Sequence, residues 1–203
     1  MSHLFEIHIT VDHTQGLYKL YEYAENNKLK TVLAVSKTGV HKDQYMLTKW
    51  VRCNTNIAIL SAQKISQDLE KDYNIKVLRT KVEAVATFEY MDNYFAENKS
   101  KLDNYFEFHF NIENCNNLTN LEKCINNIKR LPNSVLGTSI NFMGENLPLI
   151  TVRCYLPELT KANDICTYYK SCLSKEGYML STKMQSEFSV FDNNLYIDNG
   201  WLQ

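Results

Sequence analysis

The sequence has few glycines and prolines, and it lacks patterns that define several large classes of protein. Six glycines and three prolines occur in 203 residues, and no glycine-rich phosphate loop or Gly-x-Gly-x-x-Gly pattern is present. Such loops bring backbone N–H groups to a phosphate, so their absence argues against P-loop and dinucleotide-binding proteins. No serine lies in a strand-turn-helix elbow pattern, which argues against the common serine hydrolases.

Long apolar runs and an excess of one charge are also missing. No stretch of about 18 apolar residues occurs, and the chain does not open with a signal-peptide pattern, so we predict a cytoplasmic protein with no membrane partner. The formal net charge of -1 provides no basic field for nonspecific nucleic-acid binding, although a local basic cleft could still bind nucleic acid. The six cysteines form no Cys-x-x-Cys pair, which favours reduced thiols over disulfides or a zinc site.

A strand pattern that occurs twice is the most informative feature that the sequence does contain. Residues 5–12 read Phe-Glu-Ile-His-Ile-Thr-Val-Asp, and residues 106–113 read Phe-Glu-Phe-His-Phe-Asn-Ile-Glu. Apolar and polar side chains alternate in both copies, which predicts strands with one face in a core. On the other face, each copy presents a glutamate and a histidine two residues apart.

The surrounding patterns repeat in the same order, at an offset of 101 residues between Phe5 and Phe106 and between Arg52 and Arg153. Periodicity and turn residues predict strands and helices in this order. The predicted strands span residues 5–12, 29–37, 44–53, 77–85, 105–113, 134–142, 147–155 and 179–191. The predicted helices follow Asp12, span 56–72, include Leu118 to Ile128, and include Ala162 to Leu173 with an end near Gly177.

These observations predict an α+β fold built as a tandem duplication of a ferredoxin-like β-α-β-β-α-β unit. The sheets are expected to be antiparallel, with helices on one face. We place the first half at residues 1–87, a linker at 88–104, and the second half with a C-terminal extension at 105–203.

In a ferredoxin-like sheet the first strand lies between the third and the fourth, so distant polar residues are brought together. In the first half, the predicted polar face carries Glu6, His8, Thr10, Asp12, Arg52, Arg79, Lys81 and Glu83. In the second half, it carries Glu107, His109, Asn111, Glu113, Arg153, Lys183, Gln185 and Glu187. Two such faces that meet around a pseudo-two-fold axis would form one shared cleft.

The leading hypothesis from this pattern is an intracellular enzyme that processes a phosphoester or a nucleotide and requires no cofactor. His8 and His109 would be the acid–base pair, each tuned by its neighbour Glu6 or Glu107. An anionic small molecule or nucleotide would be held by the remaining polar residues. These predicted substrate-binding residues are Thr10, Asn111, Arg52, Arg153, Lys81 and Lys183.

Three other interpretations of the same face stay open. Charged residues on a sheet face are often simply solvated, with weak cross-strand pairs. A non-enzymatic module could use the face to bind an anionic ligand or partner. A divalent-metal enzyme could use Glu6, His8, Glu107 and His109 as ligands, because carboxylate and imidazole groups with an open position bind divalent ions.

The C-terminal stretch 191–201 is polar and rich in turn residues. Its simplest interpretation is a capped C-terminal turn. The alternative is a lid that adds Asp192 or Asp198 to the cleft and is pinned by Trp201.

Two short stretches, one in each half, can be compared with a motif of phosphate-processing enzymes. His8-Ile9-Thr10 resembles the His-x-Thr/Ser motif of two-histidine phosphoesterases, which also use a duplicated α+β unit with one motif per half. The resemblance implies a histidine pair that acts on a phosphoester. The second copy, His109-Phe110-Asn111, has Asn where that family has Thr or Ser, so a hydroxyl that would hold the phosphate is missing there.

Two further resemblances concern larger parts of the chain. Charged sheet interiors in a duplicated scaffold resemble the triphosphate tunnel enzymes, but residues 6–10 read Glu-Ile-His-Ile-Thr where that family has Glu-x-Glu-x-Lys. The Glu-x-His-x-Thr strand at 6–10 and the closing Asp198-Asn199-Gly200-Trp201 also resemble a family of uncharacterised hypothetical proteins. That resemblance supports the fold of two halves and attaches no activity to it.

Overall fold

The computed structural model describes residues 2–12, 17–98, 104–144 and 146–202, so part of the predicted linker, 99–103, lies outside the described residues. The strands are β1 (His3–Val11), β2 (Lys30–Val35), β3 (Asp43–Cys53), β4 (Val77–Val85), β5 (Tyr105–Ile112), β6 (Ser134–Asn141), β7 (Pro148–Cys154) and β8 (Leu180–Asp192). The helices are α1 (Leu17–Asn27), α2 (Thr55–Asp72), α3 (Phe88–Glu97), α4 (Leu118–Asn127), α5 (Leu159–Lys175) and the short 3-10 helix η1 (Leu195–Asp198).

The mixed α+β class is confirmed, and the order β-α-β-β-α-β occurs twice with α3 between the two occurrences. Strand β1 pairs with both β3 and β4, and strand β5 pairs with both β7 and β8, all antiparallel. The first strand of each half is therefore central, as predicted, which is what gives its polar side chains neighbours on both sides.

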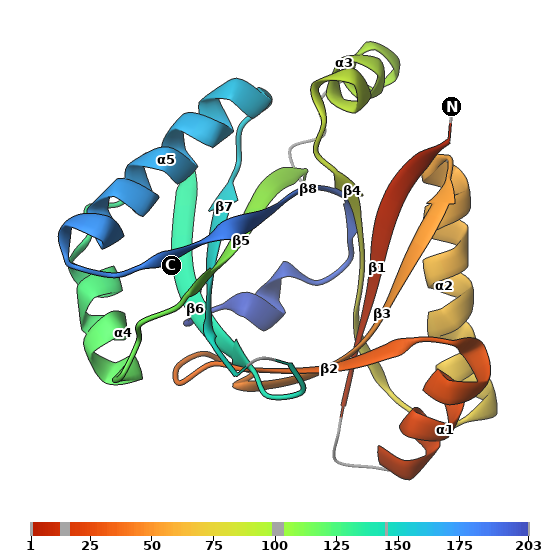
Figure 1. Ribbon diagram of the computed structural model, residues 1–203. Coiled ribbons are helices and arrows are strands. Elements are labelled where there is room, and N and C mark those ends of the chain that lie inside the picture. Colours follow the sequence, from red (N-terminus) through yellow and green to blue (C-terminus); the bar gives the residue numbers. More distant parts are fainter. Residues whose placement is uncertain (1, 13–16, 99–103, 145, 203) are drawn as a thin grey trace.

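The strands close into one barrel instead of forming two open sheets, in the order β1-β3-β2-β6-β7-β5-β8-β4 (Figure 1). Strands β4 and β8 join the halves along one side. On the other side the join is short, with Ala34 opposite Asn141 and Val35 opposite Ile140. Closure satisfies the backbone groups of edge strands that two separate sheets would leave unpaired.

The hydrophobic core lies outside the barrel, between the strands and the helices. Helices α1 and α2 cover the strands of the first half, and α4 and α5 cover those of the second half (Figure 1). Phe5 and Ile9 of β1, and Phe106 and Phe110 of β5, are at most 1% exposed in this layer. Burying each such side chain contributes about 1.5–3 kcal/mol. Since side chains alternate along a strand, the core on the outer face directs the polar residues into the barrel.

Local signals explain where several helices begin and end. The Asn54 side chain accepts a hydrogen bond from the Ile57 N–H and so caps α2. Gly177, with φ of +85°, follows α5 as predicted. Helix α3 was not predicted; in the structure it buries Met91 and Tyr94 against the core. None of the described helices combines the length and the apolar character needed to cross a membrane.

Candidate functional site

The polar faces of the two halves line one cavity of about 260 Å³ inside the barrel. Strand β1 contributes Glu6, His8 and Thr10, and strand β5 contributes Glu107 and His109. The other polar lining residues come from seven further segments: Lys30, Gln44, Thr48, Arg79, Lys81, Glu83, Ser139, Asn141, Thr151, Arg153, Gln185, Glu187 and Asp198. The polar faces of the two halves therefore line one shared, partly open cavity.

One side of the cavity is a network of buried ion pairs. Lys81 Nζ lies 2.6 Å from Glu107 Oε2 and 2.8 Å from Glu83 Oε1. Arg153 Nε donates to Glu107 Oε1 at 2.7 Å. Burial alone would raise the pKa of Glu107, but Lys81 and Arg153 lower it well below its ordinary value. These ion pairs fix the positions of the charged side chains inside the barrel.

The C-terminal tail completes this network. Asp198 of η1 is 3% exposed and accepts a hydrogen bond of 2.9 Å from Arg79 Nη1; it also pairs with Arg153. Asp192 accepts from Arg79 Nε at 3.0 Å. Burial would raise the pKa of each of these two carboxyl groups, but the arginines lower it below its ordinary value. The tail thus places Asp198 in the cavity, as the lid interpretation expects.

Close backbone contacts hold the tail in place. The Val40 N–H donates to the Asn199 carbonyl at 2.9 Å. A Cβ on Gly137 of β6 would lie 2.4 Å from the Trp201 carbonyl oxygen, and a Cβ on Gly200 would lie 2.9 Å from the Gly39 Cα. Both glycines therefore permit a contact that a larger residue would block.

The two histidines lie in the cavity beside carboxylates. His109 Nε2 is 3.3 Å from Glu107 and 3.4 Å from Glu187, and its Nδ1 is 3.1 Å from the Thr151 hydroxyl. Burial would lower the pKa of His109, but the two glutamates raise it to about 10. The imidazole is therefore a charged donor at neutral pH and not a free base.

His8 has a similar environment with looser contacts. Its Nε2 lies 3.1 Å from Glu83 and 3.8 Å from Glu6, but it makes no aligned hydrogen bond within the described residues. Burial would lower the pKa of His8, and the neighbouring glutamates raise it above its ordinary value.

A second group of carboxylates faces the cavity without a lysine or arginine partner in the described structure. Gln185 Nε2 donates to Glu6 Oε2 at 2.8 Å and to Glu187 Oε1 at 2.7 Å. Burial raises the pKa of Glu6; His8 opposes the shift and Glu187 adds to it. Ligand atoms of Glu6, His8 and Glu187 all lie within 4.8 Å of one another, so this group could hold a metal ion.

The group differs from the predicted metal ligands, which were Glu6, His8, Glu107 and His109. Glu107 is occupied by two cationic side chains, and Glu187 takes its place beside Glu6. Alternation along β8 places Glu187 on the interior face, and the predicted polar face of the second half already included it.

Arg52 lies outside the cavity, in contrast to the prediction from its offset of 101 residues. On β3, Glu6 is opposite Trp50 and Arg52 is opposite Leu4, whereas on β7 Glu107 is opposite Arg153. The pairing registers of the two halves thus differ by two residues. A shift of two keeps a side chain on the same face but moves it along the strand, which carries Arg52 beyond the barrel interior.

The same kind of shift places Lys183 outside the cavity. His8 is opposite Lys81 on β4, whereas His109 is opposite Gln185 on β8. Gln185 is therefore the structural counterpart of Lys81, and Lys183 is exposed beyond it. Asn111, the predicted substrate ligand on β5, is also not among the residues that line the cavity.

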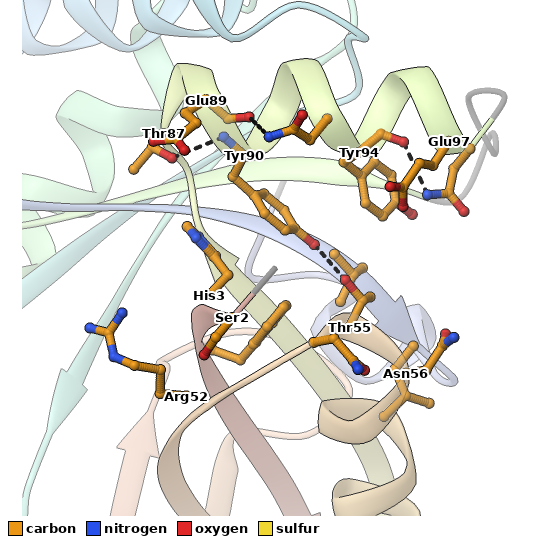
Figure 2. Close-up of a pocket in the computed structure, with 16 residues that line it drawn as sticks. Ser2, His3, Arg52, Thr55, Asn56, Thr87, Glu89, Tyr90, Tyr94 and Glu97 are labelled. Atoms are coloured by element: carbon orange, nitrogen blue, oxygen red, sulfur yellow. Dashed lines mark hydrogen bonds between the residues drawn. The ribbon is translucent and has the colours of Figure 1, made fainter.

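Arg52 instead lines a second, more exposed pocket of about 640 Å³ between the start of β1, the first turn of α2 and helix α3. Figure 2 shows His3 below Tyr90, whose hydroxyl is 3.0 Å from Thr55 Oγ1. The His3 and Tyr90 rings stack at 4.2 Å. The charged side chains that line this second pocket are exposed to solvent. The pocket therefore lacks the buried charges of the barrel cavity.

Tyr105 is the main interior residue that the sequence reasoning missed. Its hydroxyl donates to Asp192 and accepts from Arg79 at 3.1 Å, and the Arg153 guanidinium lies 4.3 Å from its ring centroid. Tyr105 shares the parity of Glu107 on β5, so alternation could have placed it inside. An apolar wall was also not predicted; it consists of Val32, Ala34, Met46, Leu149 and Trp201.

Comparisons with known proteins give no information about the chemistry of this cavity. No protein-family model matches the sequence, and no curated protein matches it. Among solved structures, a crystal structure of a "Putative Chlorite dismutase" is similar with a TM-score of 0.31. The two chains share 8% sequence identity over 93% of this chain and 95% of that one. A likeness of this size carries no argument about the site.

Proposed function

We propose that this chain is an intracellular enzyme that acts on a small phosphate ester or nucleotide-like anion inside the barrel. The observation that carries the proposal is that the two Glu-x-His strands bring both histidines to one cavity. Two imidazoles in one cavity can transfer protons to and from the oxygens around a reacting phosphorus. The free thiols of all six cysteines are typical of a reducing compartment.

The surroundings of the histidines support different roles for them. His109, paired with Glu107 and Glu187, is suited to give a proton to the leaving oxygen as the P–O bond breaks. The arm formed by His8 and Glu6 is suited to orient a water and take its proton as the new P–O bond forms. This proposal uses the acid–base pair predicted from the sequence, with His109 of the second half as the acid and His8 as the base.

The cavity lining supports a small ester as substrate. Thr10 Oγ1 and Trp201 Nε1 are buried donors without a hydrogen-bond partner in the described part of the chain, and both residues line the cavity. Donors of this kind are suited to phosphoryl oxygens, since leaving them unpaired costs free energy. The apolar wall suits the organic group of the ester. A volume near 260 Å³ falls below the usual range of about 300–1,000 Å³ and favours a small molecule.

We also infer that the two halves are tandem copies of a ferredoxin-like unit. The repeated element order supports this, and so does the strand order β4-β1-β3-β2, which matches β8-β5-β7-β6. A duplicated unit explains why two similar strands meet inside one barrel.

A non-enzymatic binding module is the alternative, and one observation favours it. Arg79, Lys81 and Arg153 are all paired with carboxylates, as in an interior built for rigidity. Such a module would bind an anionic ligand or partner in the cavity without converting it.

The test is a turnover assay on a panel of phosphate monoesters and diesters with the wild type, His109→Asn and His41→Asn. His41 lies in the β2–β3 connection and does not line the cavity, so its variant is the matched control. The proposal expects turnover by the wild type and by His41→Asn, and a loss of about 10²–10⁴-fold in kcat/KM for His109→Asn. Ligand binding without turnover would support the binding module instead, and equal turnover by all three proteins would contradict the proposal.

A further inference from the structure

The cavity and its immediate shell contain more negative than positive side chains. The buried cationic side chains are Arg79, Lys81 and Arg153. The carboxylates are Glu6, Glu83, Glu107, Glu187, Asp192 and Asp198. Six carboxylates thus face four permanent cations, counting the exposed Lys30 of the lining, and two histidines, within the described part of the chain. An anionic substrate entering this site would meet no excess of positive charge.

The unbalanced carboxylates are gathered at one place. Glu83 and Glu107 share the ammonium of Lys81. Glu6 and Glu187 share the amide of Gln185, and in the described structure their cationic contacts are the imidazoles of His8 and His109. Glu6 and Glu187 are at most 9% exposed. An amide that donates to two carboxylates fixes their orientation without neutralising them, as the surrounding residues of a metal site commonly do.

His8 completes a ligand set beside these carboxylates. Its Nε2 lies 3.1 Å from Glu83 but makes no aligned hydrogen bond in the described structure. A ring nitrogen of His8 lies with oxygens of Glu6 and Glu187 inside a span of 4.8 Å. One imidazole and two carboxylates are ligands that Mn²⁺, Fe²⁺ and Zn²⁺ accept, with positions left for water.

An independent feature points to a ligand in the same cavity. Thr10 is 1% exposed, lines the cavity two residues beyond His8, and its hydroxyl has no hydrogen-bond partner among the described residues. A buried hydroxyl without a partner is unfavourable unless a bound group or its water shell satisfies it.

We propose that Glu6, His8 and Glu187 bind one divalent cation, which supplies the positive charge that an anionic substrate requires in this cavity. With His8 and Glu6 as ligands, the ion would replace their role as base: it would polarise a phosphoryl oxygen and lower the pKa of a water, which would lose its proton to solvent. The new P–O bond to this water would form as the P–O bond to the leaving group breaks, with His109 protonating the leaving oxygen. The catalytic role rests on the proposed function, whereas the binding of the ion does not.

Binding is measured without turnover, on protein produced without a histidine tag and stripped with a chelator that is then removed. Mn²⁺ is titrated with detection by electron paramagnetic resonance, and Zn²⁺ by calorimetry. We expect one ion per chain for the wild type and at least a 10-fold weaker affinity for Glu187→Gln. Glu113→Gln, an exposed change just beyond β5, is the matched control and should bind as the wild type does.

Circular dichroism checks that each variant is folded, and Glu6→Gln replaces Glu187→Gln if the latter is not. Absence of binding to the wild type at millimolar Mn²⁺ and Zn²⁺, or unchanged affinity in the folded glutamine variant, would overturn the inference. One ion bound as expected, with no turnover of any phosphoester, would refute the proposed function and leave the metal site standing.

Discussion

Gln185 of β8 donates a 2.8 Å hydrogen bond to Glu6 of β1 across 179 residues of sequence. Strand β4 lies between these two strands in the barrel, so the bond reaches across the interior. It shows that the polar faces of the two halves meet. If the faces pointed apart into solvent, no site could be shared between them.

Arg153 and Arg52 should respond very differently to truncation, although sequence offset makes them equivalents. Arg153 is 3% exposed and pairs with Glu107 and Asp198. Arg153→Ala would leave those carboxylates without this cation, and we expect a loss of about 3–5 kcal/mol in the free energy of unfolding. Arg52→Ala, at an exposed position, should change it by no more than about 0.5 kcal/mol.

Urea unfolding of the two variants and the wild type measures both values. Arg52→Ala serves as the matched control, because the same side chain is removed from the structurally different position. Similar losses in the two variants would contradict the register shift between the halves.

Asp192 should make the free energy of unfolding depend on pH. Its bonds to Arg79 lower its pKa below the ordinary value, although burial alone would raise it. The unfolded state then binds the proton more tightly, so the carboxylate stabilises the fold above the ordinary aspartate pKa of about 4. This contribution is lost as the pH falls through the lowered native pKa.

The check is the difference in unfolding free energy between the wild type and Asp192→Asn, from pH 7 down to pH 3. The difference should be largest near neutrality and should shrink below about pH 4. The matched variant Asp164→Asn, at an exposed position of α5, should show little difference throughout. A difference for Asp192→Asn that grows as the pH falls would refute this account of the Arg79 pair.

The docked tail should be sensitive to one methyl group on β6. In Gly137→Ala the added Cβ would lie 2.4 Å from the Trp201 carbonyl, so the tail must shift. We expect a loss of about 1–3 kcal/mol in stability and a changed Trp201 fluorescence. The measurement uses a Trp50→Phe background, in which Trp201 is the remaining tryptophan.

Gly144→Ala is the control for this experiment, because the nearest atoms that its Cβ would meet belong to the Asn141 side chain, which can move. Fluorescence and stability that stay at the wild-type values in Gly137→Ala would show that the tail is not held in this position.

Much of the fold follows from the sequence because side-chain alternation is local. The parity of Phe5 and Glu6 on β1 predicted which face enters the core, and in the structure the opposite face lines the cavity. The closure of the barrel could not be predicted in this way. It depends on two residue pairs between β2 and β6, including Ala34 opposite Asn141, that leave no periodic signal.

The errors at the site have one physical origin. Residues 101 or 102 apart were treated as equivalent, but strand pairing is set by packing and turns, and the pairing register differs by two residues between the halves. The sheet face of these side chains was therefore predicted correctly, but their position along the strand was not. Arg52 and Lys183 lie beyond the cavity for this reason, and Gln185 stands where a second lysine was expected.

The most direct test of the account is kcat/KM for the wild type, His8→Ala, His109→Ala and the double variant on the best ester of the panel. If both histidines serve one reaction, each single change should lower kcat/KM by about 10²–10⁴-fold. The double variant should then lose much less than the product of the two losses, because groups that act as a unit are not additive. Turnover at the wild-type level in either folded single variant would contradict the claim that the two strands form one active site.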